Sequence, residues 1–176
     1  MATVEIKSRW SGAVLFSAEV GDGVSVELQM KVAVEMAVKA RANLADAYLA
    51  DANLARANLA GANLAGAYLA DANLAGAYLA DAKIQNNLTL IGKRPCVWFG
   101  PIGSVSRTFY GWLTNDGIHI QSGCFFGTTA EFRAKLTKTH GGTIHEQEYL
   151  LALSLVEKHF ELFPAEVAVT DSSEVM

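Results

Sequence analysis

The chain has 176 residues, of which 51% are hydrophobic and 18% are charged, and its formal net charge is −4 at pH 7. This length suits one domain or two small ones, and the composition is typical of a folded, water-soluble protein. The basic residues form no stripe, so direct binding to nucleic-acid phosphates is not expected. The sequence contains no run of about 18 apolar residues of the kind that a membrane-spanning helix needs, and the first residues do not read as a secretion signal. We therefore expect a cytoplasmic protein.

Residues 1–40 read as an N-terminal hairpin followed by a capping helix. Residues 3–7 alternate in polarity, a turn is expected near Ser11, and an apolar run follows it. Ser25 stands where it can cap a helix that runs to about Ala40. We expect this helix to cover the open end of the next segment with an apolar face, formed by Leu28, Val32 and Met36 with Val34 and Val38 beside it.

A five-residue period begins at Ala42 and ends at Ile84. An alanine precedes each large apolar residue by two positions, and leucine occupies the first eight of nine such places: Leu44, Leu49, Leu54, Leu59, Leu64, Leu69, Leu74 and Leu79. On an α-helix each leucine would advance by about 140°, and the leucines would spiral around every side. The alanine content is the one feature that favours a helix. A fixed short period instead indicates a solenoid that turns a corner every five residues.

The run Ala-(Asn/Tyr)-Leu-Ala-X resembles the pentapeptide-repeat family, whose tandem units form a right-handed, four-sided β-helix. The resemblance implies four units per coil, so residues twenty apart stack with a spacing of about 4.8 Å. We therefore expect residues 41–87 to form a quadrilateral β-helix of about two coils. Segments 4–10 and 15–18, followed by a helix leading into 40–44, also resemble pentapeptide-repeat proteins of bacteriophages and prophages.

Stacking by twenty predicts ladders on the outside of the coils. Tyr48 lies over Tyr68 and Asp51 over Asp71, which sets an aromatic strip beside an acidic strip. Such an exposed strip is a candidate contact surface. The alternative is that the tyrosines pack on a flanking segment. The candidate binding residues are Tyr48, Tyr68, Tyr78, Asp51, Asp71, Asn53 and Asn73.

From about Leu88 the sequence changes character, and residues 88–164 are expected to form a small α+β domain that caps or docks on the solenoid. The predicted elements are a strand at 96–99, a hairpin of 107–113 with 117–120, and two helices. The first helix runs to about Thr139 and starts at a capping box formed by Thr128 and Glu131, and the second runs from 144 to 163 and is ended by Pro164. Residues 165–176 are expected to form a disordered tail. The fold class is therefore mainly β with α+β flanks.

Few residues suggest catalysis. His119 and Cys124 lie five apart, but no further ligand stands at zinc-site spacing, and Cys124 and Cys96 read as buried thiols. His140 and His145 could form a metal or phosphate corner with Glu146, or could simply lie at solvated helix ends. Because no paired carboxylates, nucleophile elbow or nucleotide fingerprint appears, we expect no catalytic residues, no metal, no cofactor and no enzymatic activity.

In the pentapeptide-repeat family, long members mimic duplex DNA and bind type II topoisomerases such as gyrase. A duplex carries one charge per about 1.7 Å, whereas the charges of four aspartates in these repeats are largely offset by Arg41, Arg56 and Lys83. The repeats are therefore a poor imitation of the charge on DNA. The leading hypothesis is a non-enzymatic, homo-oligomeric binding protein of phage or prophage type. It would inhibit or sequester a component of a bacterial host or defence system, either a protein or a small nucleotide-like ligand. The alternatives are a DNA mimic directed at gyrase and a self-associating structural protein.

Overall fold

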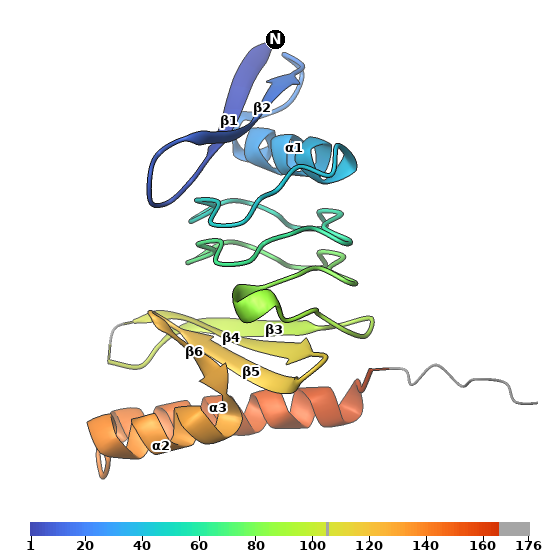
Figure 1. Cartoon of the computed structure of the whole chain (residues 1–176). Coiled ribbons are helices and arrows are strands. Elements are labelled where there is room, and N and C mark those ends of the chain that lie inside the picture. Colours follow the sequence, from blue (N-terminus) through green and yellow to red (C-terminus); the bar gives the residue numbers. More distant parts are fainter. Residues whose placement is uncertain (105, 166–176) are drawn as a thin grey trace, which may run out of the picture.

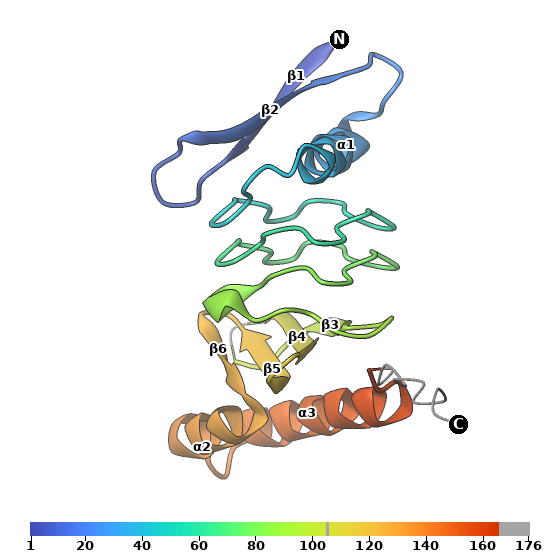
Figure 2. The same ribbon diagram turned by 45° about the vertical axis from the view of Figure 1, so that its right-hand side comes forward.

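The computed structural model describes residues 1–104 and 106–165. Its elements follow one another along the molecule in chain order: a hairpin and helix, a stack of coils, a four-stranded sheet and two helices (Figure 1). A second view shows the same order (Figure 2). Apart from Ala165, the expected disordered tail lies outside the described residues.

The N-terminal hairpin consists of β1 (Ala2–Lys7) and β2 (Val14–Val20), which pair antiparallel. Helix α1 (Val26–Lys39) follows, with Ser25 at the N-cap position but without a side-chain capping bond. The hairpin and the helix were thus predicted correctly as elements.

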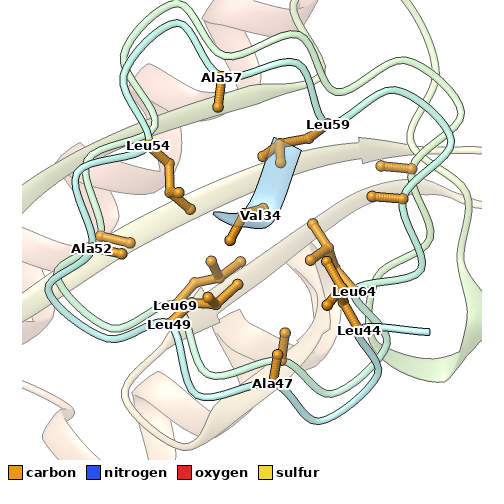
Figure 3. Close-up of a cluster of buried hydrophobic side chains, with 14 of the residues drawn as sticks. Val34, Leu44, Ala47, Leu49, Ala52, Leu54, Ala57, Leu59, Leu64 and Leu69 are labelled. Atoms are coloured by element: carbon orange, nitrogen blue, oxygen red, sulfur yellow. The ribbon is translucent and has the colours of Figure 1, made fainter. Parts of the chain in front are cut away.

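The predicted inner face of α1 is correct for Val34, which is buried, and for Val32 and Val38, which pack against the core, but it is wrong for Leu28 and Met36. Leu28 and Met36 are exposed, and the buried residues of the helix are Ala33, Val34 and Ala37. These small side chains share one core with the leucines of the coils, and Val34 points into the ring that the leucines form (Figure 3). The leucines already fill the end of the stack, which explains why a close-packed helix presents short side chains there.

Residues twenty apart are neighbours in adjacent coils. Parallel bridges join five such pairs, Asn43 to Asn63, Tyr48 to Tyr68, Asn53 to Asn73, Asn58 to Tyr78 and Asn63 to Lys83. Backbone bonds of 2.8–3.0 Å run between the coils, and the eight leucines and Ile84 are each 5% exposed or less. The predicted stacking by twenty is therefore confirmed, and the segment has a β-helix-like architecture. The right-handed, four-sided form stays a prediction.

The corners of the coils explain the variable fifth position of the repeat. Every fifth residue from Arg41 to Asp81 has a left-handed backbone, with φ between 55° and 70°. Glycine adopts this region without a penalty, and aspartate tolerates it better than most residues. Glycine or aspartate occupies seven of these nine positions, Asp46, Asp51, Gly61, Gly66, Asp71, Gly76 and Asp81.

A 3-10 turn at Gln85–Asn87 ends the coils, and an antiparallel sheet in the order β3-β4-β5-β6 follows. Its strands are β3 (Cys96–Ile102), β4 (Arg107–Thr114), β5 (Gly117–Ser122) and β6 (Phe125–Thr128). The expected strands and the hairpin around Asn115 and Asp116 are present, whereas β6 was not predicted.

Helices α2 (Thr129–His140) and α3 (Ile144–Leu162) lie on the far side of this sheet (Figure 2). The predicted capping box is present: the Glu131 amide donates to Thr128 Oγ1 at 3.2 Å, and the Thr128 amide donates to Glu131 at 2.8 Å.

Strand β4 joins the two cores of the molecule because its side chains alternate between the faces of the sheet. Tyr110 and Trp112 belong to the core of the coils, whereas Phe109 belongs to the core shared with α2 and α3. The buried Tyr110 hydroxyl donates to the Leu69 carbonyl at 2.7 Å. Burial raises the pKa of this phenol. The sheet therefore packs against the last coil through specific contacts.

Candidate binding groove

The predicted tyrosines do not form one surface. The rings of Tyr48 and Tyr68 lie 5.6 Å apart, as expected from stacking by twenty. Tyr78 instead pairs with Asn58. It lies ten residues after Tyr68, which is half of a twenty-residue coil, so it is on another side of the stack. Tyr48 and Tyr78 are 50% and 54% exposed. Tyr68 is half-buried, and the guanidinium of Arg9 in the β1–β2 loop lies 4.8 Å from its ring centroid.

The predicted asparagines have a structural role. Asn53 Oδ1 accepts a hydrogen bond from the Ala55 amide at 3.2 Å, and Asn73 Oδ1 accepts one from Ala75 at 3.0 Å. Every asparagine that precedes a leucine of the repeats closes its turn in this way, with Asn43, Asn58 and Asn63 as the others. This local bond favours asparagine at a turn without any ligand.

The predicted acidic pair has unequal surroundings. Asp51 is exposed. Asp71 accepts a hydrogen bond from Thr108 Oγ1 at 2.5 Å, and one of its oxygens lies 3.8 Å from Arg107 Nη1. Asp71 therefore ties strand β4 to the coils.

A large groove runs beside these residues. It has a volume of about 940 Å³ and is bordered by the hairpin loop, the coils, the sheet, α2 and α3. We call it the lateral groove and define it by the residues that carry its chemistry, Arg9, Trp10, Tyr68, Arg107, Cys124, Phe125, Lys135 and His140.

The lateral groove combines cations with aromatic rings. The Arg9 guanidinium lies 4.4 Å from the ring centroid of Trp10, and Lys135 Nζ lies 5.3 Å from that of Phe125. His140 Nε2 is 3.3 Å from Ser104 Oγ. None of the described residues that line the groove is acidic, although the whole chain carries a net charge of −4.

Two aspartates lie close to the lateral groove without lining it. Trp10 Nε1 donates to Asp46 Oδ1 at 3.3 Å, which holds the indole against the coils. Asp71 offsets part of the charge of Arg107. The positive character of the groove therefore rests most on Arg9 and Lys135.

The candidate catalytic groups lie in different surroundings. His119 is 5% exposed, its Nδ1 lies 3.2 Å from Thr114 Oγ1, and its ring stacks on Phe126. The rings of His140 and His145 are 6.0 Å apart. Among residues 1–104 and 106–165, no group of three or more His, Cys, Asp or Glu residues could hold a metal ion.

The prediction that both cysteines are buried is wrong for Cys124. This residue is exposed where β5 turns into β6, and it lines the lateral groove. Cys96 is half-buried, and burial raises the pKa of its thiol.

The comparisons with known proteins support the repeats alone. The family model for pentapeptide repeats matches residues 42–79 and 57–86, with eight copies. This match supports the assignment of the repeat segment to the pentapeptide-repeat family. No curated protein and no solved structure matches the chain. Within the described part of the chain, no helix is long and apolar enough to cross a membrane.

Sequence reasoning missed the lateral groove because no short motif encodes it. Its residues come from the first hairpin, the coils, the sheet, α2 and α3, and they meet only in the folded chain. The one local signal was Arg9-Trp10, a cation and a large aromatic side by side in a hairpin turn.

Proposed function

We propose that the protein is a non-enzymatic binding protein of phage or prophage type that sequesters a nucleotide-like ligand of a bacterial host or defence system. The protein acts in the bacterial cytoplasm. Its scaffold is a right-handed, four-sided β-helix, which the hairpin and α1 cap at one end and the sheet caps at the other. The observation that carries the proposal is the lateral groove, with its cations and rings and without an acidic residue among its described lining.

The ligand class follows from the chemistry of the lateral groove. Arginine and lysine bind phosphate groups, and aromatic rings stack on bases. The groove volume of about 940 Å³ lies within the range of about 300–1,000 Å³ that is common for small-molecule sites. An anionic ligand that carries an aromatic ring matches both features, which is the description of a nucleotide.

The proposal is tested by calorimetric titration of the full chain with a panel of purine nucleotides, from monophosphates to triphosphates and cyclic dinucleotides. We expect at least one member to bind, and Lys135→Gln to weaken its binding by about tenfold, since one charged contact is lost. Lys138→Gln on the same helix is the matched control, because Lys138 is exposed and does not line the groove. Absence of binding across the panel, or equal loss in both variants, counts against the proposal.

A second candidate is inhibition of a host or defence protein, and it is favoured by the exposure of Tyr48 and Tyr78 outside the lateral groove. Exposed tyrosines are frequent anchors of protein interfaces. Affinity purification from a bacterial lysate distinguishes this candidate: a partner that is lost with Tyr48→Ala but retained with Lys135→Gln supports it over nucleotide binding.

The DNA-mimic and structural alternatives receive less support. Of the two aspartates of the acidic strip, Asp71 lies 3.8 Å from Arg107, so the charge of the strip is partly offset. End-to-end assembly needs free coil edges, whereas α1 lies across one end and the sheet across the other (Figure 1). A supercoiling assay with gyrase is expected to show no inhibition.

A further inference from the structure

Helix α3 carries an apolar stripe that faces away from the protein. Its members are highly exposed, with Ile144 at 76%, Leu151 at 74%, Leu155 at 54% and Leu162 at 62%. We call these four residues the α3 stripe. The residues of α3 that pack against the rest of the protein are instead Tyr149, Ala152, Leu153, Val156 and Phe160.

The α3 stripe is a narrow seam. An α-helix turns by about 100° per residue, so Ile144 and Leu162 point in the same direction, and Leu151 and Leu155 lie within about 20° on either side. At about 1.5 Å per residue the seam is on the order of 27 Å long. Four large apolar side chains on one exposed line are unusual, since scattered single ones are the norm on protein surfaces.

No other element of the described chain covers this seam. The sheet contacts α3 on one side, and α2 is tied to α3 by the ion pair of Arg133 with Glu157 at 2.8 Å. On the helical wheel Glu157 lies about 140° from the centre of the stripe. Both views place α3 at the end of the molecule, with the sheet on one side only (Figures 1 and 2).

The residues of the seam are arranged symmetrically about position 153. Ile144 and Leu162 each lie nine residues from it, and Leu151 and Leu155 each lie two residues from it. The charged residues beside the stripe obey the same rule, since Glu148 and Lys158 each lie five residues away. An antiparallel second helix centred on the same position therefore meets each residue with its mirror partner.

We propose that α3 pairs with α3 of a second copy of this chain, antiparallel and about a two-fold axis at position 153. Ile144 then packs beside Leu162 of the second copy, and Leu151 beside Leu155. Such an interface is isologous, which is the arrangement of most homodimers.

Charge selects the antiparallel direction. In that arrangement Glu148 lies at the height of Lys158 of the second copy, and the opposite charges attract. A parallel pair would place Glu148 beside Glu148 and Lys158 beside Lys158, and like charges would repel. In the single chain Glu148 accepts a hydrogen bond from the Gly103 amide at 2.9 Å and lies 3.9 Å from His145 Nδ1, and Lys158 lies 2.7 Å from Glu161.

The proposed dimer is a specific form of the homo-oligomer that we expect from the sequence, and its formation does not depend on the lateral groove. A single helix pair is at the small end of interface sizes, so the dimer should dissociate on dilution. Sedimentation velocity of the full chain, from low to high micromolar concentration, measures this directly. We expect the mass to rise from monomer to dimer and to stop there, because a two-fold interface is closed.

Two variants test the surface. Leu151→Glu places an acid in the centre of the seam and should keep the chain monomeric over the whole range, with an unchanged circular dichroism spectrum. Val26→Glu is the control, because Val26 is 78% exposed on α1 and should leave the dimer intact. A wild-type chain that stays monomeric, or a dimer that survives Leu151→Glu, overturns the proposal.

Cysteine cross-linking tests the direction of the helices. In a background with Cys124→Ser, Leu151→Cys chains mixed with Leu155→Cys chains should form disulfide-linked dimers many times faster than either chain alone. A parallel pair predicts the reverse, with each variant linking to itself. Faster self-linking, or equal rates in all three samples, contradicts the antiparallel arrangement.

Discussion

The repeat segment and the C-terminal part of the molecule differ in what their residues do. In the repeats, leucine fills the interior, asparagine closes turns and the fifth residue forms corners, so most side chains serve the coil itself. In the C-terminal part, the pattern does not recur, and side chains such as Lys135, Cys124 and Leu151 remain exposed. Repetition thus builds a scaffold, whereas the irregular flanks contribute most of the lateral groove and the α3 stripe.

The two parts also hold together differently. Each coil is joined to the next by backbone bonds at intervals of five residues, which spread the stability over many equal contacts. The C-terminal sheet shares an apolar core with the last coil and is also joined to it by individual hydrogen bonds, such as the buried bond from the Tyr110 hydroxyl to the Leu69 carbonyl. Substitutions should therefore have different effects in the two regions, since stability is spread over many equal contacts in the coils and rests on individual contacts where the sheet meets them.

The largest effect is expected from the interior of the coils. Leu54 is fully buried, and Leu54→Ala should lower the free energy of unfolding by about 2–5 kcal/mol because it removes buried apolar contacts and leaves a cavity. Chemical denaturation measures the change. Leu151→Ala, at an exposed leucine, should change it by less than about 0.5 kcal/mol in dilute monomer. Similar losses for both variants would remove the distinction between scaffold and surface.

The contact between the sheet and the last coil comes next. Tyr110→Phe should lower the free energy of unfolding by about 0.5–1.5 kcal/mol. It removes one of the two donors to the buried Leu69 carbonyl, which keeps the hydrogen bond from the Ala72 amide at 3.0 Å. Tyr78→Phe, at an exposed tyrosine, is the control and should be neutral. If Tyr110→Phe is also neutral in denaturant titrations, the sheet does not depend on this bond to dock on the coils.

The corner positions permit a matched comparison of two glycines. Both Gly61 and Gly66 have positive φ, so alanine at either should cost about 1–2 kcal/mol. At Gly61 an added Cβ meets nothing within 4 Å, whereas at Gly66 it would lie 2.4 Å from Asp46 Oδ1. Since Asp46 Oδ1 also binds Trp10, Gly66→Ala should be the more damaging in thermal unfolding. Equal melting temperatures would show that Asp46 moves without loss.

A smaller effect is expected from pH at the end of α3. Burial lowers the pKa of His159, and the charge of Arg94 lowers it further against a hydrogen bond that raises it. In the unfolded chain His159 takes up a proton at about pH 6.5, before it does so in the folded chain. The free energy of unfolding should therefore fall as the pH drops below about 6.5, and the contribution of His159 should be fully present above that pH. His159→Gln should reduce the difference in unfolding free energy between about pH 7.5 and 5.5. An unchanged difference would contradict this assignment.

The sequence was most informative where the pattern was periodic. Leucine and alanine at fixed places predicted the inward residues. The resemblance to pentapeptide-repeat proteins, which implies four units per coil, predicted the stacking by twenty. The Thr128 capping box and the helix before Pro164 were also predicted, because local hydrogen bonds and proline chemistry determine them.

The features that the sequence did not predict depend on tertiary contacts. The inner face of α1 was misassigned in part, because the small residues Ala33 and Ala37, rather than the larger Leu28 and Met36, fit against the filled coil beside Val34. Strand β6 has four residues including Gly127, too short a pattern to read. The lateral groove joins segments far apart in the chain, so no single stretch could reveal it.

Protection of Cys124 tests the proposed role of the lateral groove most directly. Cys124 is exposed in the groove, whereas burial raises the thiol pKa of Cys96, so iodoacetamide should modify Cys124 first. Mass spectrometry then follows the rate of alkylation with and without the purine nucleotide that binds best in calorimetry. If the groove is the binding site, saturating nucleotide should slow modification of Cys124 severalfold and leave that of Cys96 unchanged. A bound nucleotide that leaves the reactivity of Cys124 unchanged would contradict the proposal and place the binding site elsewhere.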